Sequence, residues 1–215
     1  MLNFTTNTVS VEDTTNMEEV TTGFLNLNKG SFLDLEKRAP GLTKVDAGLG
    51  WDPSEFGDTI DLDLSALLLD ASGKLITKSA NDVIFFNNPK QPGIWSHGDD
   101  LTGGSSEHDE DEDDETISVI FAELDPRVKR ILFFVSIHEA VTKKQTFGMV
   151  KRPYVRLVNS DNDEELCRYT LDDDYATDTS VKFAELIKSD EGKWAFHAMG
   201  VGKRQNKEQV VLTYL

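Results

Sequence analysis

The chain has a single cysteine, few basic residues and no long apolar run, and each shortage excludes a class of protein. Cys167, the only thiol, cannot form an intramolecular disulfide, which agrees with a reducing compartment. No segment approaches the roughly 20 apolar residues that span a membrane as a helix. Because the first basic residue is Lys29, the start of the chain lacks the positive region of a secretory or transit peptide, and we expect a cytoplasmic protein.

Positive charge is scarce beside negative charge. The chain has 22 Lys and Arg residues against 39 Asp and Glu residues, which gives a formal net charge of -17. Nucleic acid and anionic lipid are repelled by such a surface over a Debye length of about 8 Å. We therefore expect no direct binding to nucleic acid and contact with a membrane only through a bridging cation, and multivalent cations are the natural partners.

Fingerprints of the common enzyme classes are missing as well. Nucleophile elbows, phosphate-binding glycine loops and dinucleotide motifs are absent, since the segment Gly48-Leu49-Gly50 lacks the third glycine. The 4 histidines form no close-spaced zinc motif. The sequence thus predicts no enzyme, and only metal-dependent hydrolysis by clustered carboxylates stays open as a catalytic alternative.

Short segments of alternating apolar and polar residues dominate from Ser31 onward. Residues 131–137 are almost continuously apolar, which predicts a central strand that is buried on both faces. Turn signals separate three pairs of alternating segments and predict three hairpins, which are residues 60–67 with 74–77, residues 154–158 with 165–171, and residues 181–187 with 193–199. We expect an all-β fold, a two-sheet β-sandwich with long acidic loops and one or two short helices near residues 121–124 or 140–145.

The most unusual segment is residues 99–115, which holds ten acids and no Lys or Arg. Its acids are Asp99, Asp100, Glu107, Asp109, Glu110, Asp111, Glu112, Asp113, Asp114 and Glu115. Crowded carboxylates repel one another unless a cation or full solvation relieves them, so the segment is either a metal site or a solvated loop. Gly98, Gly103 and Gly104 bracket its first two acids as in a tight loop around an ion, which favours the metal site.

A second acidic motif precedes this loop in the segment Asp61-Leu62-Asp63. Alternation along a strand places both carboxylates on one face and Leu62 on the other, so the two acids are able to share an ion. Calcium takes six to eight oxygens, and Asn87, Asn88, Asp99 and Asp100 are candidates to supply more of them. An amphipathic strand with a wet acidic face explains the same pattern without an ion.

Eight short segments follow one another in an order that is typical of one family. They are Ala39-Pro40-Gly41-Leu42, Gly48-Leu49-Gly50-Trp51-Asp52, Asp61-Leu62-Asp63-Leu64-Ser65, Phe85-Phe86-Asn87-Asn88, His97-Gly98-Asp99-Asp100-Leu101-Thr102-Gly103, Asp113-Asp114-Glu115, Ile137-His138-Glu139-Ala140 and Arg156-Leu157-Val158-Asn159. Over roughly residues 29–202 the chain resembles the TerD family of tellurite-resistance and stress-response proteins.

The resemblance implies a two-sheet β-sandwich that binds one or two calcium ions through acidic loops. Carried over position by position, it gives the candidate ligands Asp52, Asp61, Asp63, Asn88, Asp99, Asp100, Asp113, Asp114 and Glu115. The family usually has Asn at the position of Asp100, and residues 105–112 are an insertion in the loop. We expect residues 1–22 to form an N-terminal extension, 23–202 the sandwich domain, and 203–215 a divergent C-terminal tail.

The function that the resemblance implies is a non-catalytic role as a sensor or assembly module in the response to tellurite, chemical stress or phage. Its expected partners are calcium and other proteins of a stress-response complex. The alternative is a module that docks on membranes or partners through calcium, with Trp95 inserting into the interface. A metal-dependent hydrolase is the remaining alternative.

Overall fold

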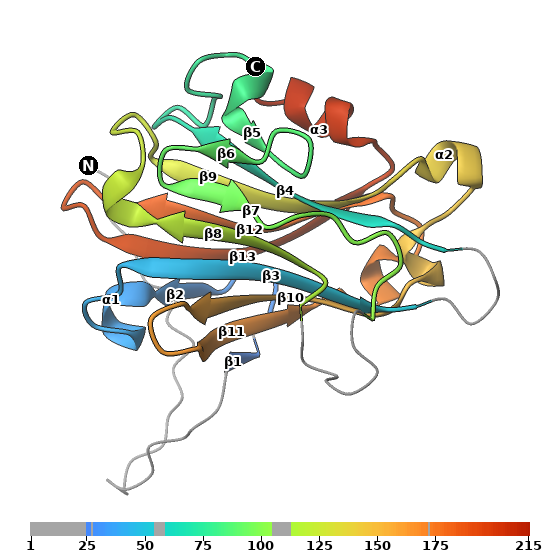
Figure 1. Ribbon diagram of the computed structural model, residues 1–215, viewed down its shortest axis with the longest axis horizontal. Coiled ribbons are helices and arrows are strands. Elements are labelled where there is room, and N and C mark those ends of the chain that lie inside the picture. The colour runs from blue at the N-terminus through green and yellow to red at the C-terminus, as the bar shows by residue number, and fades with distance from the viewer. Residues whose placement is uncertain (1–24, 27, 54–58, 105–112, 172) are drawn as a thin grey trace, which may run out of the picture.

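The computed structural model of the protein describes residues 25–26, 28–53, 59–104, 113–171 and 173–215, which fold into two packed β-sheets (Figure 1). The first sheet has the order β1 (Leu25–Asn26), β11 (Glu164–Thr170), β10 (Lys151–Asn159), β3 (Lys44–Asp52), β8 (Glu115–Ile120), β7 (Ile94–Ser96) and β6 (Lys90–Gln91). The second has the order β2 (Phe32–Asp34), β13 (Trp194–Lys203), β12 (Ser180–Lys188), β9 (Arg130–Ile137), β4 (Leu62–Leu69) and β5 (Val83–Ile84).

Neighbouring strands run antiparallel in both sheets, except that β1 pairs in parallel with β11. Two of the three predicted hairpins are present, as β10 with β11 and β12 with β13. The expectation of an all-β, two-sheet sandwich is therefore confirmed. The hairpin predicted between residues 60–67 and 74–77 is wrong, because only an isolated bridge between Leu69 and Leu75 joins these segments.

Helices are short and lie between or beside the strands. They are α1 (Leu35–Arg38), α2 (Ala140–Lys143), α3 (Lys207–Leu212) and the 3-10 turns η1 (Ala80–Asp82), η2 (Phe121–Glu123), η3 (Phe147–Met149) and η4 (Asp173–Tyr175). Both places at which the sequence predicted a short helix contain one, as η2 and α2. In the described ranges, no helix has the length and apolar character needed to cross a bilayer.

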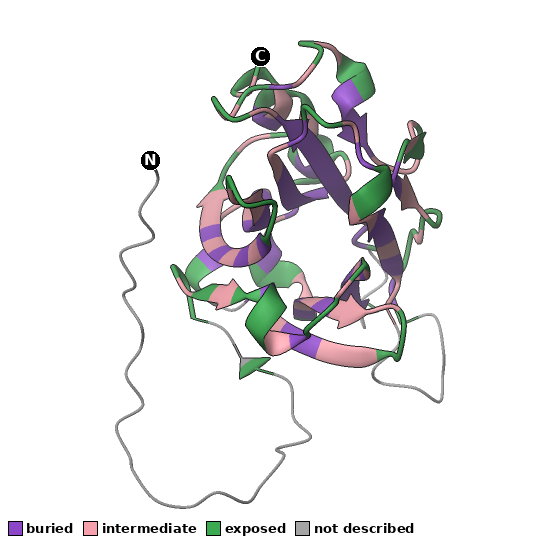
Figure 2. Ribbon diagram, turned by 90° about the vertical axis from the view of Figure 1, so that its left-hand side faces the viewer, coloured by how far each residue is buried: buried purple, intermediate pink, exposed green. Residues whose placement is uncertain are grey.

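The main core lies between the sheets and is built from buried residues of both, and Figure 2 colours these parts of the strands purple. Strand β9 contributes side chains to both faces of its sheet. Phe133 and Val135 point into this core, while Leu132 and Phe134 point to the opposite face. All four side chains are fully buried, so the predicted central strand with two covered faces is confirmed.

The outer face of the second sheet is covered by the C-terminal helix α3, which lies over β4 and β9 (Figure 1). Val210 of α3 is fully buried against Leu67, Leu69 and Phe134. The sequence predicted a half-exposed strand at residues 60–67, but every residue of β4 is buried, because α3 covers the face that alternation assigned to solvent.

Candidate metal centre

Three of the predicted ligands come together at the start of β4. Asp61 and Asp63 project from the same face of this strand, and Asp99 approaches from the loop that follows β7. Each residue contributes one carboxylate oxygen, and these oxygens lie within 4.8 Å of one another. Asp61, Asp63 and Asp99, which we call the acidic triad, form the one group of at least three potential metal-ligating side chains found within the described ranges.

Without a bound cation, burial makes the ionised form of the acidic triad electrostatically unfavourable. Asp61 and Asp63 are 7% and 3% exposed, and Oδ1 of each is buried with no hydrogen-bond partner in the part of the chain that the structure describes. Desolvation raises the pKa of Asp61, and it raises the pKa of Asp63 to about 6. Buried carboxylate oxygens without a donor fit a hard cation such as calcium, which binds oxygen ligands.

Glu115 lies directly behind the acidic triad and links the two sheets. It begins β8 in the first sheet, and its Oε2 accepts a hydrogen bond of 2.7 Å from the backbone N–H of Leu64 in the second. Its other oxygen accepts a bond of 3.4 Å from the N–H of Asp100. Burial, together with the smaller effect of the charges of Asp63 and Asp99, raises the pKa of Glu115 to about 9, which favours the protonated carboxyl at neutral pH in the absence of a cation.

The loop that carries Asp99 is shaped by its neighbour Asp100. Oδ1 of Asp100 accepts hydrogen bonds from the N–H groups of Thr102, at 2.7 Å, and Gly103, at 2.8 Å. Gly103 has a φ of +72°, and a Cβ at this position would lie 2.5 Å from Nε1 of Trp51. The glycine predicted to bracket the acids is thus needed for the tight turn that presents Asp99.

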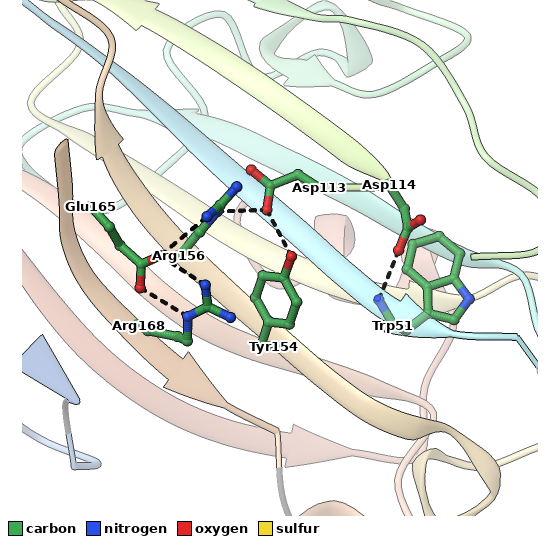
Figure 3. A network of polar contacts seen from close by, with 7 residues as sticks. All are labelled: Trp51, Asp113, Asp114, Tyr154, Arg156, Glu165 and Arg168. Atoms are coloured by element: carbon green, nitrogen blue, oxygen red, sulfur yellow. Dashed lines mark hydrogen bonds and ion pairs between the residues drawn. The ribbon is translucent and has the colours of Figure 1, made fainter. Parts of the chain in front are cut away.

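The acids at the far end of the loop have other partners (Figure 3). Asp113 accepts hydrogen bonds from Nε of Arg156, at 2.8 Å, and from the hydroxyl of Tyr154, at 3.2 Å. Asp114 accepts a bond of 2.8 Å from the backbone N–H of Trp51. Both side chains fasten the start of β8 to the strands β10 and β3, and neither belongs to the acidic triad.

Two further predicted ligands make contacts that shape the chain. Both oxygens of Asp52 pair with the guanidinium of Arg152, at 2.7 and 2.9 Å. The side-chain nitrogen of Asn88 donates to backbone carbonyls, most closely to that of Val83 at 2.6 Å. The structure therefore brings together three of the nine predicted ligands, places Glu115 and Asp100 directly beside them, and gives the other four partners in the surrounding loops and strands.

Two basic side chains that the sequence analysis did not connect with this site approach Asp63. Nδ1 of His138 lies 3.7 Å from Oδ2 of Asp63, and Nζ of Lys207, at the start of α3, lies 4.0 Å from the same oxygen. No local pattern in the sequence links Lys207 to Asp63, since 144 positions separate them and the contact depends on how α3 packs.

The single thiol lies apart from this chemistry. Cys167 is 1% exposed in β11, and burial raises the pKa of its thiol to about 12. The thiolate is the reactive form of cysteine, so this side chain is an inert member of the core.

Comparison with known proteins identifies the family. The TerD domain matches residues 24–214. The chain is 37% identical over 194 residues to general stress protein 16U of Bacillus subtilis, covering 88% of this chain and 96% of that protein. It is 41% identical over 181 residues to the tellurium resistance protein TerD of Alcaligenes sp., covering 83% and 90%.

A solved structure agrees with this assignment at the level of the fold. The crystal structure of a homologue of a telluride resistance protein from Streptomyces coelicolor superposes with a TM-score of 0.64, covering 80% of this chain and 96% of that one at 23% identity. The sandwich, the order of the sequence motifs and the match along nearly the whole described chain agree, and the chain belongs to the TerD family.

Proposed function

We propose that the protein is a calcium-binding module of a stress response, such as that to tellurium compounds, and that it acts as a sensor or assembly component without catalysis of its own. The observation that carries the proposal is the pair of buried, unpartnered oxygens on Asp61 and Asp63, which face Asp99 in the acidic triad. The names of the relatives, which are resistance and stress proteins, support the stress-response part.

Calcium fits the acidic triad better than zinc or magnesium. Zinc in proteins prefers nitrogen and sulfur ligands, whereas the three groups here are carboxylates. Magnesium demands near-ideal octahedral geometry, while calcium accepts six to eight oxygens in flexible arrangements. In this proposal one ion binds the triad, and the neighbouring Asp100, backbone carbonyls and water complete its oxygen ligands.

Binding of the ion would change the charge of one end of the sandwich. Two positive charges would offset the repulsion among Asp61, Asp63 and Asp99 and tie the loop after β7 to β4. A ligand that binds only the folded state stabilises it by RT ln(1 + [L]/Kd), which is about 2.7 kcal/mol at a hundredfold excess over Kd. A loop held in this way is a surface that a partner protein of the response can recognise only in the calcium-bound state.

Calorimetric titration of calcium into chelator-treated protein tests the proposal. We expect saturable binding near one ion per chain, and its loss in the variant Asp61→Asn, because this change removes a ligand charge at the centre of the site. Asp190→Asn is the matched control, since it removes the same charge from the exposed turn between β12 and β13. Weak heat without saturation, equal in both variants and abolished by salt, would show that the acids are only a solvated surface.

A second function is favoured by two exposed apolar side chains, one on the segment that carries Asp99 and one on the segment that follows His138. Leu101, in the loop that carries Asp99, is 57% exposed, and Val141, on the helix α2 that follows His138, is 83% exposed. Apolar side chains next to a cation site suit docking on an anionic membrane, with calcium bridging the acids to lipid phosphates. Trp95 fits this role less well, because it lies half-buried on β7 with Nζ of Lys44 5.6 Å from its ring centre.

A further inference from the structure

The C-terminal helix delivers a positive charge directly to the acidic triad. Nζ of Lys207 lies 4.0 Å from Oδ2 of Asp63, and the lysine side chain is only 17% exposed. The same ammonium group lies 4.1 Å from the ring centre of Phe85 and 5.0 Å from that of Phe86. Lys207 is therefore held against Asp63 by two aromatic rings as well as by charge.

The position of Lys207 depends on the docking of α3. Asn206 caps the helix through a reciprocal pair of hydrogen bonds with Gln209, each 2.9 Å long, which fixes the turn that contains Lys207. Val210 anchors the helix in the apolar cluster on the outer face of the second sheet. At the far end, the carbonyl oxygen of Tyr214 accepts a hydrogen bond of 2.8 Å from the N–H of Leu75.

We propose that Lys207 is the built-in counter-ion of the acidic triad, and that a divalent cation competes with it for Asp63, so that ion binding and the docking of α3 oppose each other. This inference rests on the proposed calcium site. Without the metal ion, the ammonium group offsets part of the carboxylate repulsion. With the ion bound, two positive charges cancel most of the negative charge of the triad, and Lys207 loses most of its attraction to Asp63.

The coupling is reciprocal by thermodynamic necessity. If calcium weakens the contact between Lys207 and Asp63, then this contact weakens calcium binding by the same factor. The structure thereby connects a candidate ion site at one end of β4 with the helix that covers the apolar outer face of β4 and β9. Release of α3 would expose this face, and the ion site would act as a switch for an apolar surface.

The first test compares calcium affinity in two lysine variants. Lys207→Met keeps the apolar stem against Phe85 and Phe86 but removes the charge, and we expect calcium to bind about tenfold more tightly, on the scale of a unit charge a few ångströms from the ion. Lys182→Met is the matched control, because Nζ of Lys182 donates to the hydroxyl of Tyr214, at 3.2 Å, beyond the C-terminal end of α3 and not to the acidic triad. An affinity in Lys207→Met equal to that of the wild type or of the control would overturn the inference and leave the calcium site intact.

A second test is independent of metal. In chelator, Lys207→Met should lower the midpoint of urea unfolding in the wild-type background and much less in the Asp63→Asn background, because the partner charge is then gone. Equal losses in both backgrounds would contradict the contact itself. If the wild-type chain binds no calcium, the proposed function and the competition fail together, and this metal-free cycle still reports whether Lys207 and Asp63 interact.

Hydrogen exchange of the α3 amides tests the switch. We expect calcium to accelerate exchange at Val210 and Val211 in the wild type and to have no effect in Lys207→Met, since the ammonium group that competes with the ion is then missing. Calcium that slows exchange in α3, or that acts equally on both proteins, would refute the opposition between ion binding and helix docking.

Discussion

At the residue scale, Glu115 is a buried carboxyl beside the candidate ion site, and its ionisation is unfavourable in the folded chain. Its carboxyl is 5% exposed and accepts the N–H of Leu64, and its pKa is raised to about 9 by burial. Asp63, in the neighbouring acidic triad, has a pKa raised to about 6. Both groups bind a proton more tightly in the folded than in the unfolded chain, so folding is favoured at low pH and opposed as they ionise.

The pH dependence of stability follows from these shifts. In chelator, the contribution of Glu115 is fully present below pH 4.5, the ordinary pKa of a glutamate, and is lost as the pH rises toward 9. The free energy of unfolding should fall in this range by at most about 1.4 kcal/mol per pH unit for one proton. Glu115→Gln keeps an oxygen acceptor for Leu64 without the ionisation and should flatten this slope, as measured by urea unfolding at pH 5, 7 and 9. A variant slope as steep as that of the wild type would assign the titration to other groups.

Sequence alone predicts some residues of the site for a physical reason and misses others. The two-residue repeat of a strand was enough to place Asp61 and Asp63 on one face, and the structure has them there. No sequence pattern predicts that Asp113 pairs with Arg156 or that Lys207 approaches Asp63. These residues lie far apart in the chain, and tertiary packing alone brings them together.

At the element scale, a buried network of charges joins three strands at the end of the acidic loop (Figure 3). Arg156 of β10 pairs with Asp113, next to β8, at 2.8 Å and with Glu165 of β11 at 3.2 Å. The side chains of Arg156 and Asp113 are 18% and 11% exposed. Gly48 of β3 leaves the room for this network, since a Cβ there would overlap the Asp113 carboxylate. Gly48 therefore has a structural reason, the space for the Asp113 carboxylate, although it belongs to no nucleotide-binding motif.

Removing the charge of Arg156 alone should lower the free energy of unfolding more than removing the charges of both Arg156 and Asp113. Arg156→Met leaves the buried Asp113 carboxylate without its main cation, and we expect a loss of about 3 kcal/mol in the free energy of unfolding. Addition of Asp113→Asn should restore part of that loss, because the uncompensated charge disappears. Arg127→Met, which breaks an exposed ion pair with Asp125, is the control and should change the urea midpoint little. Additive losses in the double variant would argue against a coupled network.

Elements also differ in how well the sequence predicts them. The continuous apolar run of β9 and the turns of the two hairpins predicted their strands, because those signals are local. Helix α3 was not predicted, since six residues give too short a periodic pattern. Its absence from the prediction also explains the error at β4, whose outward face is buried only because α3 covers it.

At the scale of the whole molecule, the net charge of -17 decides which surfaces the protein can approach. An anionic membrane repels such a chain until cations bridge the two, so the proposed membrane docking would depend on calcium and weaken with competing salt. Leu101 and Val141 are exposed on the segments that carry Asp99 and His138, and in the membrane proposal they would enter the lipid interface once the ion has neutralised the repulsion.

Sedimentation with vesicles that contain phosphatidylserine separates membrane docking from recruitment of a protein partner. If the membrane function holds, the protein should pellet with calcium but not with chelator, and the double variant Leu101→Ser and Val141→Ser should stay in the supernatant while still binding calcium. Leu25→Ser is the control, because it removes an exposed apolar side chain from the edge strand β1. Saturable calcium binding without pelleting of the wild type would exclude the lipid surface, and the calcium-bound loop would then be a site for another protein of the response.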